Sequence, residues 1–180
     1  MDKLHGLITE YLYKYIRNIP DFPKPGIQFK DITPLLKEPE ALQLTTRLLA
    51  RPFNKMDVDY VLGIESRGFI FGTLLAQELN AGFIPVRKPG KLPGDTVDES
   101  YKLEYGEATV EMHKDALEPG KKVLVHDDLI ATGGSAAAAT RLINYAGADL
   151  VGYSFIIELG ELEGHKALDQ NVPYEVLMAL

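Results

Sequence analysis

The chain has 180 residues, of which 46% are hydrophobic and 25% are charged, and it contains 16 Gly, 11 Pro and no Cys. This composition excludes fibrous, disulfide-stapled and mostly disordered proteins, and it leaves no thiolate nucleophile or Cys-type metal site. A formal net charge of −7 argues against binding to nucleic acid or to an anionic membrane. No apolar run approaches the roughly 18 residues of a membrane helix and no secretory signal opens the chain, so we expect a cytoplasmic protein.

The first 51 residues mix helical patterns with a proline-rich break. Apolar residues recur at helical spacing from Leu4 to Ile19, which predicts a helix that ends at Pro20. Residues 21–29 contain two more prolines and are predicted to form a shaped loop. Helical periodicity returns over 40–51. These elements predict an N-terminal extension of one domain that spans residues 1–180.

Short apolar runs alternate with helical patterns in the rest of the chain. The runs predicted as strands are 60–64, 83–86, 108–112, 122–126, 151–157 and 174–178, and the predicted helices are 69–79 and 135–145. Ser135 is placed to cap the second of these helices, and Gly147 follows its end. Strands that alternate with helices predict an α/β fold with a mainly parallel central sheet flanked by helices.

Three unusual segments follow predicted strands, where parallel sheets collect their ligands. They are the turn 65–68, the segment 87–106 and the segment 127–135, of which residues 127–134 are predicted to form a loop. The second of them has few core residues and is predicted to be a loop of about twenty residues. Loops beyond roughly 12 to 15 residues are uncommon unless they act as lids or are disordered.

The third segment carries the strongest chemical pattern. Small residues from Thr132 to Ser135 lie between a strand and a helix N-terminus, where backbone N–H groups and the helix dipole can hold a phosphate. Asp127 and Asp128 would repel that phosphate, but they can accept hydrogen bonds from ribose hydroxyls. The pattern fits a ribose 5-phosphate site. An ordinary turn with solvated aspartates is the alternative that the residues alone leave open.

This segment resembles the phosphoribosyl diphosphate fingerprint of the type I phosphoribosyltransferase family. Further segments resemble the adenine-specific members of that family, namely 22–27, 29–34, 63–69, 87–94, 101–106 and 115–120. The resemblance implies the family fold, with an N-terminal hood over about 1–35 and a flexible lid over about 87–106. It also implies transfer of a phosphoribosyl group from phosphoribosyl diphosphate to adenine in purine salvage, giving AMP and pyrophosphate. Mg²⁺ on substrate oxygens and waters, and a homodimer, are implied as well.

The resemblance assigns roles residue by residue. It implies Ala131, Thr132, Gly133, Gly134 and Ser135 for the 5′-phosphate; Ser66, Arg67, Gly68, Arg87, Lys88 and Lys91 for the diphosphate; and Gln28, Phe29, Lys30 and Leu129 for adenine. The implied catalytic residues are Asp127, Asp128 and Arg67, together with Glu104 beside the lid residue Tyr105. Adenine N9 must lose a proton during the reaction, and a lid carboxylate can take it. Without the resemblance, Arg87, Lys88 and Lys91 would be interpreted as a solvated charged face, and Tyr105 as a packing residue. A place in the core is the alternative for Phe29.

Several positions depart from the family pattern. Lys30 stands where Arg is common, Gln28 where the residue is often apolar, and Glu65 where some members have Asp. His126 replaces an apolar residue, and it is either structural or makes the surroundings of Asp127 sensitive to pH. The four His residues are scattered, so no protein-built metal site is expected.

Three other functions are weighed against this one. The same chemistry on another purine base would be decided around Gln28 to Lys30. A regulator that binds phosphoribosyl diphosphate without turnover should lack Glu104 and Tyr105 or carry a basic appendage, and this chain shows neither feature. A dinucleotide-binding protein is excluded because the glycine-rich motifs of that class are missing.

Overall fold

The computed structural model of the chain describes residues 3–102 and 106–180. The chain forms two compact units, Met1–Leu48 and Leu49–Leu180, and each is described by itself. The first unit extends past residue 35, which is the expected end of the hood. The hood and the lid themselves stay predictions.

The N-terminal unit combines helices with a β-hairpin. Its elements are α1 (Lys3–Tyr13), β1 (Arg17–Pro20), β2 (Gln28–Asp31), α2 (Thr33–Lys37) and most of α3 (Pro39–Ala50). The prediction of one helix as far as Ile19 is wrong beyond Tyr13, because β1 pairs antiparallel with β2. The same pairing places Gln28 and Phe29 in a strand, so the predicted loop ends two residues earlier. Arg17 Nε donates a hydrogen bond of 2.9 Å to Asp31 Oδ2 at the start of this ladder. The helix predicted over 40–51 is confirmed.

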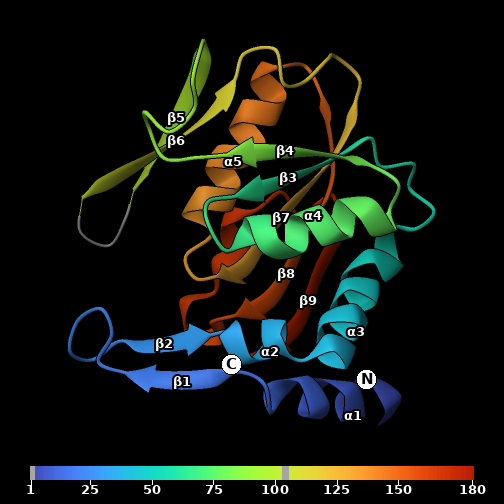
Figure 1. Cartoon of the computed structure of the whole chain (residues 1–180). Helices are drawn as coiled ribbons and strands as arrows, with labels where there is room; N and C mark the ends of the chain where they lie inside the picture. The colour runs from blue at the N-terminus through green and yellow to red at the C-terminus, as the bar shows by residue number, and fades with distance from the viewer. Residues whose placement is uncertain (1–2, 103–105) are drawn as a thin grey trace. The chain divides into compact units, whose positions relative to one another are not determined.

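The second unit is built on a five-stranded parallel sheet (Figure 1). Its strands are β3 (Tyr60–Ile64), β4 (Gly82–Val86), β7 (Lys122–Ile130), β8 (Asp149–Glu158) and β9 (Tyr174–Ala179), in the order β4-β3-β7-β8-β9. Every neighbouring pair in it is parallel. The helices α4 (Gly68–Glu78) and α5 (Gly134–Tyr145) flank this sheet. The predicted α/β fold class is therefore confirmed, as are the strands predicted in these places.

The two helices cover opposite faces of the sheet. Val123 and Val125 of β7 belong to one core cluster with the alanines of α5. His126, the next residue of β7, faces α4, because a Cβ at Gly72 of that helix would lie 3.6 Å from the His126 ring. Successive side chains of a strand point to opposite faces, so α4 and α5 lie on different sides. Figure 1 shows α4 in front of the sheet and α5 behind it.

An antiparallel pair of strands begins within the segment 87–106, which was expected to be a loop, and its second strand confirms the strand predicted over 108–112. β5 (Thr96–Lys102) pairs with β6 (Glu107–His113) along its whole length. The loop prediction is therefore wrong over 96–102. Val97 and Tyr101 of β5 pack against the hydrophobic core of this unit, and all three residues between them are polar. That mixture hides the alternation which marks a strand.

β7 is longer than predicted and carries the acidic pair. The expected strand 122–126 continues to Ile130, and Asp127 pairs with Phe155 of β8. The loop prediction for 127–134 is wrong over its first four residues, because the ladder to β8 continues through them. Ser135 does not cap α5. The capping position is Gly133, whose φ of 78° is left-handed.

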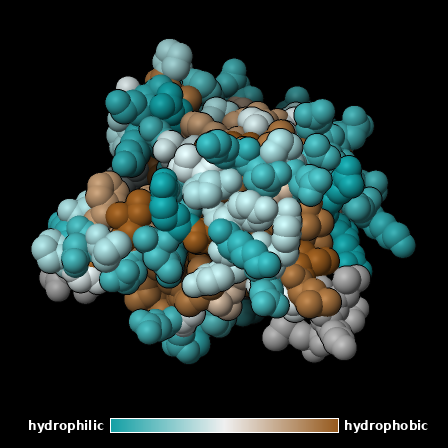
Figure 2. Space-filling model, turned by 60° about the horizontal axis from the view of Figure 1, so that its bottom comes forward, coloured by the Kyte–Doolittle hydropathy of each residue, from teal (hydrophilic) through white to brown (hydrophobic). Residues whose placement is uncertain are grey.

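The described part of the second unit also contains three short 3-10 helices, namely η1 (Arg51–Phe53), η2 (Gly160–Leu162) and η3 (Gly164–Ala167). On the face that Figure 2 shows, hydrophilic residues predominate and hydrophobic residues form smaller areas. Large exposed hydrophobic side chains in the described residues include Tyr145, which is 70% exposed, and Leu7, which is 57% exposed. Among the described residues, no helix has the length and apolar character needed to cross a membrane.

Candidate active site

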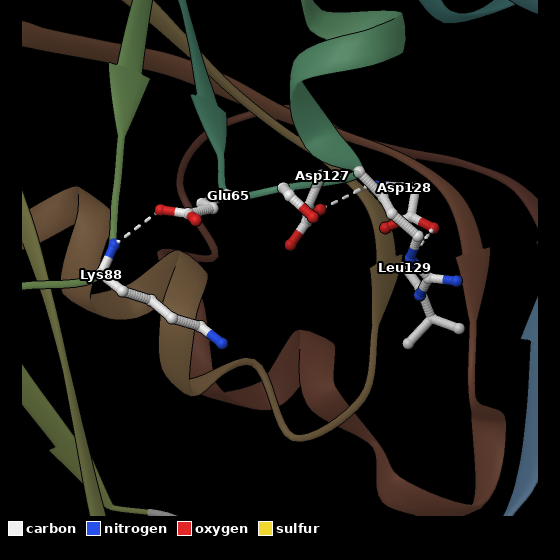
Figure 3. Close-up of a pocket in the computed structure, with 7 residues that line it drawn as sticks. Glu65, Lys88, Asp127, Asp128 and Leu129 are labelled. Atoms are coloured by element: carbon white, nitrogen blue, oxygen red, sulfur yellow. Dashed lines mark hydrogen bonds and ion pairs between the residues drawn. The ribbon is translucent and has the colours of Figure 1, made fainter. Parts of the chain in front are cut away.

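A cavity of about 300 Å³ opens where three neighbouring strands of the sheet end (Figure 3). It is lined by Glu65, Ser66, Arg67, Lys88, Asp127, Asp128 and Leu129. The first three follow β3, Lys88 follows β4, and the last three are in the final part of β7. Parallel strands bring their carboxyl ends to one edge of the sheet, which places these residues together.

The acidic pair is held by backbone and by a guanidinium group. Asp128 is 3% exposed, and its Oδ2 lies 3.0 Å from Arg67 Nε. The Asp128 backbone N–H donates a hydrogen bond of 2.8 Å to Asp127 Oδ1. Gly68 packs directly on this strand end, since a Cβ there would lie 2.8 Å from Asp127 Oδ1. The turn after β3 and the acids of β7 are therefore in direct contact.

The two carboxyl groups hold protons more tightly than exposed aspartates do. Burial raises the pKa of Asp127 well above its usual value, and the negative charge of Asp128 raises it further. Burial also raises the pKa of Asp128, and the Arg67 charge opposes that rise. Two adjacent acids of this kind titrate as a pair.

Glu65 organises the side of the cavity opposite the acids. Arg87 donates to both of its carboxylate oxygens, from Nε at 3.1 Å and from Nη2 at 3.3 Å. The backbone N–H of Lys88 donates to Glu65 Oε2 at 3.0 Å. Burial acts to raise the pKa of Glu65, but these hydrogen bonds outweigh it and leave the pKa below its usual value. Figure 3 shows the Lys88 side chain extending toward the same open space as Asp127.

The Arg87 side chain does not line the cavity, because its donors are used in contacts with neighbouring residues. Its Nη1 donates to the Lys91 carbonyl at 3.0 Å, and its guanidinium lies 5.9 Å from the centre of the Phe69 ring. Neither Arg87 nor Lys91 is among the residues that line the cavity. Both shape the turn that carries Lys88.

The buried carboxylate of Glu111 holds the turn after β4 in place by accepting hydrogen bonds from its backbone. Glu111, on β6, is 6% exposed, and its Oε1 accepts hydrogen bonds of 3.1 Å from the backbone N–H groups of Lys91 and Leu92. Its Oε2 accepts one of 3.4 Å from the Thr96 hydroxyl. Sequence reasoning missed Glu111. The signal that could have found it is an acidic residue within a predicted strand of alternating apolar and polar residues.

A second cavity, of about 180 Å³, is formed by the loop that leads into α5. It is lined by Leu129, Ile130, Ala131, Thr132, Gly133, Gly134, Ser135 and Ala136, with Tyr101 and Phe155. The N-terminus of α5 therefore opens onto a small hollow, as a phosphate site requires. The Tyr101 ring packs on Gly134, where a Cβ would lie 2.7 Å from Tyr101 Cδ2. Burial, and then the charge of Asp127, raise the pKa of Tyr101.

Arg141 fastens the β5–β6 hairpin to α5. Its Nε donates to Glu99 Oε2 at 2.7 Å, and its Nη2 donates to the Ser100 carbonyl at 2.7 Å. Both acceptors belong to β5, next to Tyr101. Tyr101 and Arg141 were not singled out from the sequence, because their importance depends on packing between distant elements.

The remaining predicted residues lie elsewhere. Gln28, Phe29 and Lys30 are on β2 of the N-terminal unit, where the Phe29 ring meets Phe22 edge-to-face at 5.1 Å and Lys30 Nζ donates to Asn18 Oδ1 at 2.8 Å. Glu104 and Tyr105 lie outside the described residues.

His126 is fully buried, and burial lowers its pKa to about 4, so it is neutral at neutral pH. This supports a structural role. Within residues 3–102 and 106–180, no group of three or more His, Asp or Glu side chains is placed to hold a metal ion.

Comparisons with known proteins agree on one family. The model of the phosphoribosyl transferase domain matches residues 31–173. An adenine phosphoribosyltransferase of Koribacter versatilis is 53% identical over 172 residues, which cover 96% of this chain and 94% of the relative. The crystal structure of adenine phosphoribosyltransferase from Rhodothermus marinus matches with a TM-score of 0.94 at 55% identity, covering 97% of this chain and 99% of that one. The Saccharomyces cerevisiae enzyme, complexed with D-2,5-dideoxy-2,5-imino-altritol 1,6-bisphosphate and adenine, matches with a TM-score of 0.89 at 40% identity, covering 96% and 99%.

Proposed function

Because the chain belongs to the phosphoribosyltransferase family, among its adenine phosphoribosyltransferases, we propose that its two neighbouring cavities bind the two ends of phosphoribosyl diphosphate. The reaction transfers the 5-phosphoribosyl group to adenine and releases pyrophosphate, giving AMP in purine salvage. The observation that carries the assignment is that Leu129 lines both cavities. A ligand with an anionic group at each end can therefore lie with its sugar beside the acidic pair.

The 5′-phosphate binds in the smaller cavity. Ala131 to Ser135 supply backbone N–H groups at the start of α5, and the helix dipole favours the negative charge. The Tyr101 ring closes one wall. The loop needs no positively charged side chain for this task, which fits its composition of small residues.

The diphosphate binds in the larger cavity. Ser66 and Arg67 line it from the turn after β3, and Gly68 follows them as the first residue of α4. The Lys88 ammonium group supplies positive charge from the other side. Arg87 and Lys91 act by shaping the turn that presents Lys88, since the Arg87 guanidinium is already bound to Glu65. Charge-assisted hydrogen bonds of this kind are the strongest that a diphosphate can receive.

Asp127 and Asp128 act on the ribose between these groups. Their carboxylates accept hydrogen bonds from the sugar hydroxyls. They also stabilise the positive charge that develops on the ribose as the bond to the diphosphate breaks, because fixed charges aimed at a developing charge lower the barrier. The Arg67 charge favours the ionised form of Asp128 and so opposes the rise in pKa that burial causes.

Mg²⁺ fits this site as a companion of the substrate. The cavity offers carboxylate oxygens of Asp127 and Asp128, but no set of three protein ligands among the described residues, so the ion would rest mainly on diphosphate oxygens and waters. When bound, it neutralises charge on the leaving diphosphate. Titration of phosphoribosyl diphosphate binding with and without Mg²⁺ tests this assignment.

Adenine recognition is assigned to Gln28, Phe29 and Lys30 with Leu129, and proton transfer at the base is assigned to Glu104 beside Tyr105. These assignments rest on the family resemblance alone. The single-turnover rate of Glu104→Gln tests the second, with Glu107→Gln as its matched control. A rate within a few-fold of the unmodified protein would remove the role of Glu104.

The decisive experiment measures pyrophosphate release from phosphoribosyl diphosphate with adenine, hypoxanthine, guanine and xanthine in parallel. We expect turnover with adenine alone. Turnover with another base would move the specificity assignment, whereas tight binding without turnover on any base would favour a regulator. Homodimerisation and a cytoplasmic location belong to the same proposal. Sedimentation equilibrium and cell fractionation test them.

A further inference from the structure

Residues 160–167, which form η2 and η3, lie directly behind the loop 131–134 that enters α5. We call them the backing segment. A Cβ added at Gly133 would collide with the carbonyl oxygen of Gly164, and a Cβ added at Gly164 would collide with the carbonyl oxygen of Ala131. The two stretches of chain therefore touch backbone to backbone, with no room for a side chain between them.

Position 164 requires glycine because there is no space for a side chain, and not because of its backbone conformation. Gly133 has a φ of 78°, which favours glycine by itself, but Gly164 has no positive φ. Its hydrogen is the only substituent that fits, because a Cβ would also come within 2.9 Å of Ile130 Cγ1. Close contact with the loop is thus the physical reason for a glycine at this position.

The backing segment is anchored independently of the loop. His165 Nδ1 lies 2.7 Å from Glu158 Oε1, and Glu158 is only 7% exposed at the end of β8. The Gln170 side chain donates to the His165 carbonyl at 2.7 Å and to the Leu168 carbonyl at 2.9 Å. These bonds hold η3 in place against the sheet, so η3 can act as a fixed surface.

We infer that the backing segment sets the conformation in which the loop presents its N–H groups to the 5′-phosphate, and that Gly164 is a positioning residue for this ligand group. The inference rests on the proposed function. Several N–H groups converge on one phosphate only in a narrow range of backbone geometry. A displacement of about 1 Å can cost on the order of 100-fold in a preorganised site.

The test compares Gly164→Ala with the matched control Gly160→Ala. Gly160 lies in the same segment, but a Cβ there would meet only the Leu180 carbonyl, at 3.8 Å. Calorimetry gives the affinity of each protein for AMP, for ribose 5-phosphate and for pyrophosphate. In Gly164→Ala we expect affinity for the two 5′-phosphate ligands to fall about tenfold or more, with pyrophosphate affinity changed less than about twofold. The control should bind all three like the unmodified protein.

A second pair of variants serves if Gly164→Ala does not fold. His165→Ala removes the anchor to Glu158, whereas His165→Asn keeps a side-chain donor near it. We expect the first to weaken AMP binding selectively and the second to restore it.

Two results for Gly164→Ala would overturn the inference. One is an equal loss of affinity for all three ligands, and the other is a lowered Tm with unchanged affinity for AMP. Failure of the unmodified protein to bind AMP or ribose 5-phosphate would instead refute the proposed function itself.

Discussion

Arg67 Nε lies 3.0 Å from Asp128 Oδ2, so a cation at the turn after β3 directly neutralises an acid on β7. Both residues line the larger cavity. The Asp128 carboxyl is buried, and burial alone would keep it protonated at a higher pH. The ion pair therefore opposes the effect of burial on the pKa of Asp128, and it joins the two strand ends that carry these residues.

Replacing Arg67 should change the pH dependence of the reaction. In Arg67→Gln the pKa of Asp128 rises further, because the opposing charge is gone. We expect kcat/KM to fall by about 100-fold or more and its acidic limb to move to higher pH. Arg67→Lys keeps the charge and should leave that limb closer to its original position. A pH profile with the same acidic limb in Arg67→Gln would contradict this account.

Asp127→Asn should stabilise the protein while it abolishes most activity. The pKa of Asp127 is raised in the folded state, so the folded chain binds the proton more tightly than the unfolded chain. Stability is then lost as pH rises from about 4 toward the raised pKa, because a carboxyl that folding partly removes from water must ionise. Asn removes this cost and can still accept the hydrogen bond from the Asp128 amide.

We therefore expect the Tm of Asp127→Asn to exceed that of the unmodified protein by about 2–4 °C at pH 8. The difference should shrink toward pH 4. Thermal unfolding across this range measures it, with the exposed Asp149→Asn as control. A difference in Tm that does not vary with pH would rule out the titration of Asp127 as its cause.

Glu111→Ala should damage diphosphate binding from a distance. The substitution leaves the N–H groups of Lys91 and Leu92 without their acceptor, at a cost of about 1–3 kcal/mol in unfolding free energy. The turn that carries Lys88 then loses its fixed shape, and we expect the Kd for pyrophosphate to rise about tenfold. Glu107→Ala, on the exposed start of the same strand, is the control. Unchanged pyrophosphate affinity in Glu111→Ala would show that the turn keeps its shape without the carboxylate.

Tyr101 should matter through its ring. The ring packs on Gly134 and forms a wall of the smaller cavity. We expect Tyr101→Ala to weaken AMP binding about tenfold, and Tyr101→Phe to remain within about twofold of the unmodified protein. Equal loss in the two variants would assign the effect to the hydroxyl group instead.

The sequence predicts the sheet well where a strand is apolar throughout. Tyr60–Ile64 is such a run, and β3 has the predicted bounds. β5 was not predicted because polar residues occupy all three positions between Val97 and Tyr101. β1 was not predicted because its partner strand follows only after a proline-rich turn. A local sequence pattern does not show which segment a strand pairs with. β1 and β5 form strands because they pair with β2 and β6.

The same distinction applies to the site. Arg67, Asp127 and Asp128 stand in motifs that can be recognised along the chain, and the structure brings them together around one cavity. Glu111 and Gly164 act on the backbone of segments about 20 and 30 residues away, so no local motif marks them. Supporting residues of this kind become visible only when the fold is known.

The contact between Gly68 and the end of β7 also matters for protein engineering. The helix start and the strand meet with no side chain between them, so neither can be shifted or enlarged without moving the other. Substitutions at this contact would therefore disturb the acidic pair, and the contact is unsuitable for engineering a new activity. A redesign for a different acceptor should keep Gly68 and the end of β7 unchanged. It should substitute residues in segments that pack through their side chains.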